Sequence, residues 1–256
     1  MTERTWFDRR TFLTLLVAGL VGVVAVLPYQ FGLTGWPAAA SIPLLLVLTL
    51  LQNGILIGIA VLVGLRLGTP IRLAAYRPEA VPGRGLAATY GRGAVVGVAV
   101  GALILLLDAV VFAPLIREAV LGGAVLPAQP SQGQVAWVGL FASLYGGITE
   151  ELFLRFGLMT LLAWLGWRLV GRPADLPAGV AWVAILVAAL LFGLGHLGAT
   201  AAVFELTPAV LVRMLVLNGV AGVAFGWLYW RYDLVSALVA HFSADVVLHV
   251  VVVFLV

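Results

Sequence analysis

Seven long apolar runs, separated by short polar stretches, constrain the fold of this chain more than any other feature. They cover approximately residues 11–29, 39–65, 93–116, 135–169, 178–198, 208–230 and 234–256. A helix needs roughly 20 consecutive apolar residues to cross the hydrocarbon core of a bilayer. The sequence therefore predicts an all-α fold, a polytopic transmembrane helical bundle with seven or eight spans.

The composition excludes a soluble domain. Hydrophobic residues make up 63% of the chain and charged residues 10%, and the mean hydropathy is +1.16. Soluble domains average about 45–50% apolar and about 25% charged residues. The chain has no cysteine, which excludes disulfides and thiolate metal sites. Without a visible repeat or low-complexity tail, residues 1–256 are expected to form a single integral membrane domain.

The placement of arginine predicts the orientation in the membrane, because short cytoplasmic loops retain positive charge. Every second connection is basic: the segment before the first run, and the connections after the second, fourth and sixth runs. These segments hold Arg4, Arg9, Arg10, Arg66, Arg72, Arg77, Arg84, Arg92, Arg168, Arg172 and Arg231. The opposite loops hold Arg117 with Glu118, or Glu205 alone. We therefore expect a multi-pass protein of the cell membrane with a cytoplasmic N-terminus. Arginines spread in this way give no face for nucleic acid.

Two glutamates and an arginine lie inside the fourth run, in the segment Glu150-Glu151-Leu-Phe-Leu-Arg155. Residues four apart are neighbours on a helix, so the spacing predicts an ion pair between Glu151 and Arg155. Glu150 is rotated by about 100° and is left to face a cavity. The alternative is that both carboxylates only balance a buried charge. The run is longer than a perpendicular span requires, which predicts a tilted helix, an extension or a kink near Gly146-Gly147.

Histidines recur at helical spacing in the fifth and seventh runs. Phe192 and His196 share one helix face, and His241, Asp245 and His249 follow one another in steps of four on the last run. The steps of four predict a stripe that points into the bundle. A lone membrane histidine such as His196 is often only a hydrogen-bonded residue, and His249 lies nearer the chain end.

Together these groups could hydrolyse an amide bond without a covalent intermediate. A carboxylate in a membrane cavity is poorly solvated and therefore becomes a competent base for a water proton. An imidazole can orient that water, and a second imidazole and a carboxyl can stabilise the oxyanion that forms on the carbonyl.

Three ordered motifs, Glu-Glu-x-x-x-Arg, Phe-x-x-x-His and His-x-x-x-Asn/Asp, resemble those of the CPBP intramembrane protease family. That family includes type II CAAX prenyl endopeptidases and the bacteriocin-processing and self-immunity proteins of the Abi family. The resemblance covers approximately residues 135–250, which we take as the protease core.

The resemblance implies a mostly helical intramembrane endopeptidase with its site between spans. Glu150 would be the catalytic base and His196 its partner in activating water, while His241 and Asp245 would stabilise the oxyanion. The positions that would support these four residues are Glu151, Arg155 and Phe192.

The sequence departs from the prenyl endopeptidases at position 245, where they typically present asparagine. An ionised Asp245 would repel an oxyanion, so its carboxyl must be protonated, turned away or used differently. Family members have been described both as metalloproteases and as metal-independent. No His-Glu-x-x-His motif occurs. We expect no cofactor, with the alternative of a divalent metal ion on His196, His241, Asp245 and His249 if these converge.

The expected partners are the lipid bilayer and a membrane-anchored peptide or protein substrate. The bias towards alanine, glycine, valine and arginine suggests a prokaryotic source, in which prenylated CAAX proteins are not expected. One alternative is a catalytically silent immunity or scaffold protein. The other is a proton-coupled transporter, which would also place ionisable residues such as Glu150 and Asp108 inside spans.

Overall fold

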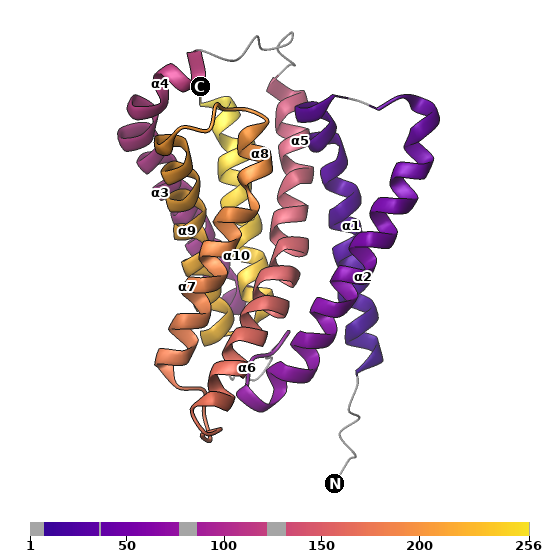
Figure 1. The fold of residues 1–256 in the computed structure, drawn as a ribbon, viewed down its shortest axis with the longest axis vertical. Helices are drawn as coiled ribbons and strands as arrows, with labels where there is room; N and C mark the ends of the chain where they lie inside the picture. The colour runs from indigo at the N-terminus through magenta and orange to yellow at the C-terminus, as the bar shows by residue number, and fades with distance from the viewer. Residues whose placement is uncertain (1–7, 36, 77–85, 122–131, 256) are drawn as a thin grey trace.

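We analysed a computed structural model of the chain, which describes residues 8–35, 37–76, 86–121 and 132–255. Three arginines used in the orientation prediction, Arg4, Arg77 and Arg84, lie outside these residues. Within the described ranges the chain forms helices and no strand, as Figure 1 shows.

Seven helical segments of the described chain are long and apolar enough to cross a membrane. They are Arg9–Gly32, Ile42–Ile71, Tyr90–Arg117, Gln132–Leu169, Ala178–Ala201, Pro208–Arg231 and Leu234–Phe254. The predicted all-α bundle is confirmed, and each span coincides with one of the seven apolar runs.

The individual elements divide these spans further. The part of the chain with the first three spans contains α1 (Arg9–Thr34), η1 (Ala39–Ser41) between the first two spans, α2 (Ile42–Gly68), η2 (Thr69–Ile71), α3 (Leu86–Leu107), the π-helical η4 (Asp108–Phe112) and α4 (Ala113–Leu121). The last four contain α5 (Gln132–Leu144), η5 (Tyr145–Glu150), η6 (Leu152–Met159), α6 (Thr160–Leu169), α7 (Ala178–Gly195), α8 (Leu197–Ala201), α9 (Pro208–Arg231), α10 (Leu234–Val246), η7 (Val247–Val251) and η8 (Val252–Phe254).

Large apolar side chains remain exposed along the outer faces of the bundle. Examples are Val17 on α1, Leu44 on α2, Val95 on α3, Leu190 on α7 and Val212 on α9. A soluble monomer rarely exposes contiguous apolar surface of this extent. In lipid, however, such faces are well solvated, and the helices satisfy their own backbone groups. The chain is therefore a multi-pass membrane protein.

The fourth span is interrupted by π-helical turns near its middle. Residues Tyr145–Glu150 and Leu152–Met159 are π-helical, and α5 and α6 flank them within one helical span. The first π-helical segment includes the Gly146-Gly147 pair, near which a kink was one of three predicted alternatives. A π turn contains more residues than an α turn and redirects the side chains that follow, and such turns frequently occur at functional sites.

Local sequence signals fix where the last two spans begin. Thr207 accepts a hydrogen bond from the Val210 N–H and precedes Pro208 at the first helical position of α9. Asp233 caps α10 by accepting hydrogen bonds from the N–H and hydroxyl of Ser236, at 2.8 and 2.7 Å. These caps set the register of α10, which carries His241 two turns after its start.

Glycines let α3 approach the backbone of α10 closely. A Cβ atom added at Gly97 would overlap the carbonyl of Ala240, and one added at Gly101 would lie 2.9 Å from the carbonyl oxygen of Ala244. Small residues at spacings of four commonly allow such close contacts between membrane helices. Since Ala240 precedes His241, this contact also positions the last motif.

The first two spans pack against the fourth. The Thr149 hydroxyl donates a 2.8 Å hydrogen bond to the Gly19 carbonyl on α1, and Gly64 on α2 makes room for the ring of Phe156. Spans that carry no recognisable motif therefore hold the helix that carries the paired glutamates.

The spans alternate in direction through the bundle. In Figure 1 the start of α1 and the end of α6 lie at the bottom, whereas the start of α5 and the end of the seventh span lie at the top. We call these the N-terminal end and the C-terminal end of the bundle.

Candidate functional site

Most of the ionisable residues singled out in the sequence line one cavity of about 800 Å³ between the spans. Its lining includes all members of the predicted catalytic and metal-ligating sets, which are Glu150, His196, His241, Asp245 and His249. They come from the fourth, fifth and seventh spans, so the fold brings together residues that are 99 positions apart in the case of Glu150 and His249.

The two adjacent glutamates approach opposite nitrogens of the same imidazole. Glu151 Oε1 lies 2.7 Å from His241 Nδ1, and Glu150 Oε2 lies 3.7 Å from His241 Nε2. The shorter distance is that of a charge-assisted hydrogen bond, in which Nδ1–H donates to the carboxylate. This bond orients the ring and leaves Nε2 directed towards Glu150.

Glu151 also pairs with Arg155, as the spacing of four predicted. Arg155 Nη1 lies 2.9 Å from Glu151 Oε1, and the two side chains are 2% and 0% exposed. Arg155 Nη2 donates a 3.3 Å hydrogen bond to the Gly222 carbonyl on α9. Its guanidinium carbon lies 4.9 Å from the centre of the Phe192 ring. The arginine is thus held by the fourth, fifth and sixth spans at once.

Glu150 is more accessible than Glu151. Its side chain is 20% exposed, whereas that of Glu151 is fully buried. The surplus carboxylate therefore faces the cavity, while its neighbour is committed to Arg155 and His241.

Asp245 lies on the same side of the ring as Glu150. Its Oδ2 is 3.6 Å from His241 Nε2. A Cβ atom added at Gly146, on the first π-helical segment, would overlap the Asp245 carboxylate. Gly146 thus provides space for this carboxyl group, whereas Gly147 lies against Phe242, since α5 and η5 pack against α10.

Two aromatic rings restrict the motion of His241. The Phe225 ring stacks on the imidazole with a centroid distance of 4.7 Å and an interplanar angle of 25°. The Phe192 ring meets it edge-on at 5.6 Å. With its Nδ1 bound and its face covered, the imidazole presents only Nε2 to the cavity.

His196 ends α7 at the cavity wall. Its Nδ1 lies 2.8 Å from the Phe192 carbonyl oxygen, and its ring packs edge-on against the Phe192 ring at 4.8 Å. A carbonyl oxygen can only accept, so Nδ1 donates and we assign the neutral ring as the Nδ1–H tautomer. Nε2 then carries a lone pair that can accept a hydrogen bond.

His249 lies further along the last span, in the π-helical η7. Its ring lies 6.1 Å from that of Tyr29 on α1, another residue of the cavity wall. The predicted stripe of His241, Asp245 and His249 therefore faces one cavity, although the α-helical steps of four end before His249.

The cavity wall also contains polar residues that the sequence analysis did not single out, notably Tyr145, Arg213 and Asn218. Tyr145 lies five residues before Glu150, a spacing that places two residues on one face of a π-helix but not of an α-helix. The sequence analysis did not predict a π-helix here and therefore did not place Tyr145 beside Glu150. Arg213 could have been recognised, because an arginine inside an apolar run is by default a functional candidate.

Asp108, which favoured the transporter alternative, has a partner in the structure. Arg213 on α9 forms two contacts of 2.6 Å with the two carboxylate oxygens of Asp108 on η4. The side chains are 22% and 29% exposed and line the cavity. Asp108 is thus part of a two-point ion pair.

The described residues contain no group of three or more His, Cys, Asp or Glu side chains that could hold a metal ion. The set formed by His196, His241, Asp245 and His249 lines the cavity without converging on one point of coordination.

Comparison with known proteins supports the resemblance inferred from the motifs. Residues 130–247 match the model of a family described as type II CAAX prenyl endopeptidase, Rce1-like. No curated protein and no solved structure matches the chain. The match covers all three motifs and confirms the resemblance to the CPBP and CAAX protease family.

Proposed function

We propose that this chain, whose residues 130–247 belong to the Rce1-like type II CAAX prenyl endopeptidase family, is an intramembrane peptidase that hydrolyses a membrane-associated protein or peptide. The family implies a protease, and the site suggests how the residues divide the work. The observation that carries the proposal is the meeting of Glu150, His196, His241 and Asp245 at one cavity within the bundle.

Glu150 is the general base. It is the more exposed of the two glutamates, and its carboxylate is not bound to Arg155. Water in the cavity donates a hydrogen bond to Glu150 and transfers its proton as its oxygen attacks the carbonyl carbon of the substrate.

His196 orients that water. Because its Nδ1 donates to the Phe192 carbonyl, its Nε2 accepts the second hydrogen bond of the water molecule. The lone pair of the water oxygen is then directed at the substrate carbonyl. Holding the water in this geometry lowers the barrier to its attack.

His241 and Asp245 stabilise the oxyanion. With protons on both ring nitrogens, His241 donates through Nδ1 to Glu151 and through Nε2 to the oxyanion. The Oδ2 atom of Asp245 lies 3.6 Å from the same Nε2 atom. In its protonated form Asp245 donates a second hydrogen bond to the oxyanion. An ionised Asp245 would repel the oxyanion, whereas a neutral carboxyl in an apolar site can donate a hydrogen bond to it.

The step is balanced in protons and electrons. A carbon–oxygen bond forms, and the carbonyl electron pair moves to the oxygen. When the oxyanion collapses, the carbon–nitrogen bond breaks and the leaving amine takes the proton held by Glu150. The products are a carboxylic acid and an amine, and the enzyme is regenerated.

Cleavage of a library of membrane-anchored peptides in liposomes tests this proposal. The proteins compared are the wild type, Glu150→Gln and the matched control Glu205→Gln, which changes an exposed glutamate outside the cavity wall. Each is assayed with and without a chelator. We expect cleavage by the wild type and the control, a loss of cleavage in Glu150→Gln and no effect of the chelator.

The other outcomes separate the alternatives. Equal cleavage by wild type and Glu150→Gln would remove Glu150 as the base, and a loss with chelator alone would indicate a metal ion. Absence of cleavage by all three proteins, across the library, would favour the silent immunity or scaffold protein.

A further inference from the structure

The cavity extends from the site towards only one end of the bundle. Among the described residues of its wall, Val26 and Tyr29 lie near the end of α1, Asp108 follows α3, and Val203 follows α8. All of these positions lie in the half of the bundle nearer its C-terminal end, where spans one, three and five finish and spans four and six begin; Figure 1 shows this end at the top. The wall reaches exposed residues there, including Val203.

The opposite direction is closed by packed side chains. Beyond Glu151 and His241, towards the N-terminal end, lie Phe156, Met159 and Tyr229, each at most 1% exposed. The hydroxyls of Thr160 and Tyr229, 2.7 Å apart, satisfy each other within this layer. None of these residues belongs to the cavity wall. The site is thus a pocket with a floor and not a channel through the bundle.

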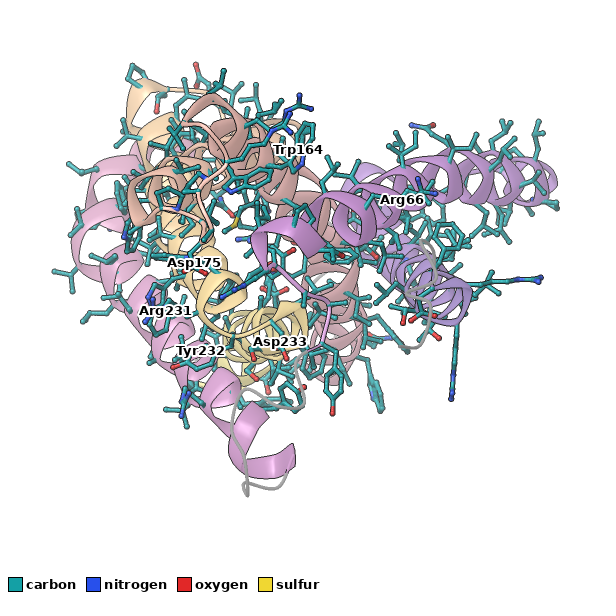
Figure 2. The ribbon with its side chains drawn as sticks, turned by 90° about the horizontal axis from the view of Figure 1, so that it is seen from below. Arg66, Trp164, Asp175, Arg231, Tyr232 and Asp233 are labelled. Atoms are coloured by element: carbon teal, nitrogen blue, oxygen red, sulfur yellow. The ribbon has the colours of Figure 1, made fainter. Side chains whose placement is uncertain are left out.

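The closed end is the arginine-rich end. Figure 2 looks at this end, where Arg66, Arg231 and Asp175 are labelled. The described arginines at this end are Arg9, Arg10, Arg66, Arg72, Arg92, Arg168, Arg172 and Arg231. At the other end the described part of the chain has Arg117, besides Arg213 within the cavity wall. Because cytoplasmic loops retain arginine, the closed end faces the cytoplasm.

From the direction of the cavity and the charge at its closed end, we infer that the site opens to the extracytoplasmic side of the membrane. This inference rests on the proposed peptidase function and names its substrate class. The substrate is an apolar membrane-anchored segment, such as a leader or an anchor, whose scissile bond lies in the outer half of the bilayer or just outside it. A peptide presented from the cytoplasmic face does not reach Glu150.

The mouth of the cavity fits a segment of this kind. Its walls are formed largely by apolar side chains such as Leu191, Leu217 and Leu248, and the Asp108–Arg213 pair neutralises the two charges there. An apolar stretch of substrate therefore enters without leaving a charge unpaired, since buried charges need partners.

Labelling of single cysteines tests the orientation without any need for activity. The chain has no cysteine of its own, so each introduced thiol reports alone. Val203→Cys places a thiol at the mouth, and Ala174→Cys places one in the exposed connection between α6 and α7 at the closed end. Intact and permeabilised cells are treated with a membrane-impermeant maleimide, and labelling in detergent establishes that each thiol is reactive.

We expect Val203→Cys to be labelled as fully in intact cells as in permeabilised cells, and Ala174→Cys to be labelled only after permeabilisation. The reverse pattern would overturn the inference. Labelling of both positions in intact cells would also overturn it, because the chain would then have no single orientation.

A second measurement separates this inference from the proposed function. Two single-span reporters carry the same cleavable apolar segment, one at the extracytoplasmic and one at the cytoplasmic boundary of the span. Cleavage of the first alone, lost in Glu150→Gln, supports both proposals. If the cysteines are labelled as expected but neither reporter is cleaved in a way that depends on Glu150, the peptidase proposal is refuted and the inferred orientation stands. Cleavage of the cytoplasmic reporter that depends on Glu150 would refute the orientation and leave the peptidase standing.

Discussion

The buried ion pair between Glu151 and Arg155 should be the most sensitive element of the site to the loss of one charge. Its side chains are 0% and 2% exposed, so neither charge can be solvated by water when its partner is removed. Removing one partner of a buried pair costs about 3–5 kcal/mol, whereas replacing both can be nearly neutral. The prediction concerns Glu151→Gln, Arg155→Met and the double variant.

The size of each effect follows from the contacts that remain. A glutamine at 151 still offers an oxygen to His241 Nδ1, so Glu151→Gln mainly leaves the charge of Arg155 with the Gly222 carbonyl and an aromatic face. We expect the free energy of unfolding to fall by about 3–5 kcal/mol. Arg155→Met leaves Glu151 with His241 and should cost a similar amount. The double variant should cost less than either single variant, because no unpaired charge remains.

Unfolding by sodium dodecyl sulfate in mixed micelles, followed by the fluorescence of the 8 tryptophans, measures these differences. Asp175→Asn is the control, because it breaks the exposed ion pair with Arg72, whose side chains are 74% and 73% exposed. An exposed pair is worth about 0–1 kcal/mol. A cost of Glu151→Gln no larger than that of the control, or a double variant equal to the sum of the single variants, would refute this account.

Two glycines give further predictions. Gly146→Ala should abolish cleavage with a loss of stability of only about 1–3 kcal/mol, because its Cβ displaces the Asp245 carboxylate, whereas Gly133→Ala has open space around the new atom and should keep activity. Gly97→Ala should lower the free energy of unfolding, because the new methyl group separates α3 from α10. Gly91→Ala, in the same helix with nothing nearby, should raise it by up to about 1 kcal/mol through its better helix propensity. Peptide cleavage and detergent unfolding check both pairs, and an inactive Gly133→Ala or a stabilised Gly97→Ala would contradict them.

The architecture could be predicted because each span is specified locally. An apolar run of sufficient length forms a helix in lipid whatever its neighbours are, and the seven runs correspond to the seven spans. The ion pair of Glu151 and Arg155 was equally local, since it depends only on a spacing of four along one helix.

The remainder of the site depends on which helices are neighbours, and the sequence carries no local signal for this. The hydrogen bond from His241 to Glu151 joins the seventh and fourth spans, and the sequence analysis assigned Glu151 only to Arg155. The ion pair of Asp108 and Arg213 was missed for the same reason, because it joins the third and sixth spans. The π-helical turns at Tyr145–Glu150 and Leu152–Met159 were not predicted as such, although a kink near Gly146-Gly147 was one of the alternatives.

The structure gives a geometric reason for the two glutamates to be consecutive. The two nitrogens of an imidazole point in different directions, and consecutive side chains on a helix diverge by about 100°, so two adjacent glutamates can each face a different ring nitrogen. Glu151, fixed by Arg155, reaches Nδ1, and Glu150 reaches the side of Nε2. If the second carboxylate were moved one further residue along the helix, the charge of the site would stay the same, but Nε2 would keep only the Asp245 carboxyl beside it, at 3.6 Å. The motif therefore encodes the direction in which His241 presents its free nitrogen, and Arg155 acts by keeping one of the two carboxylates in place.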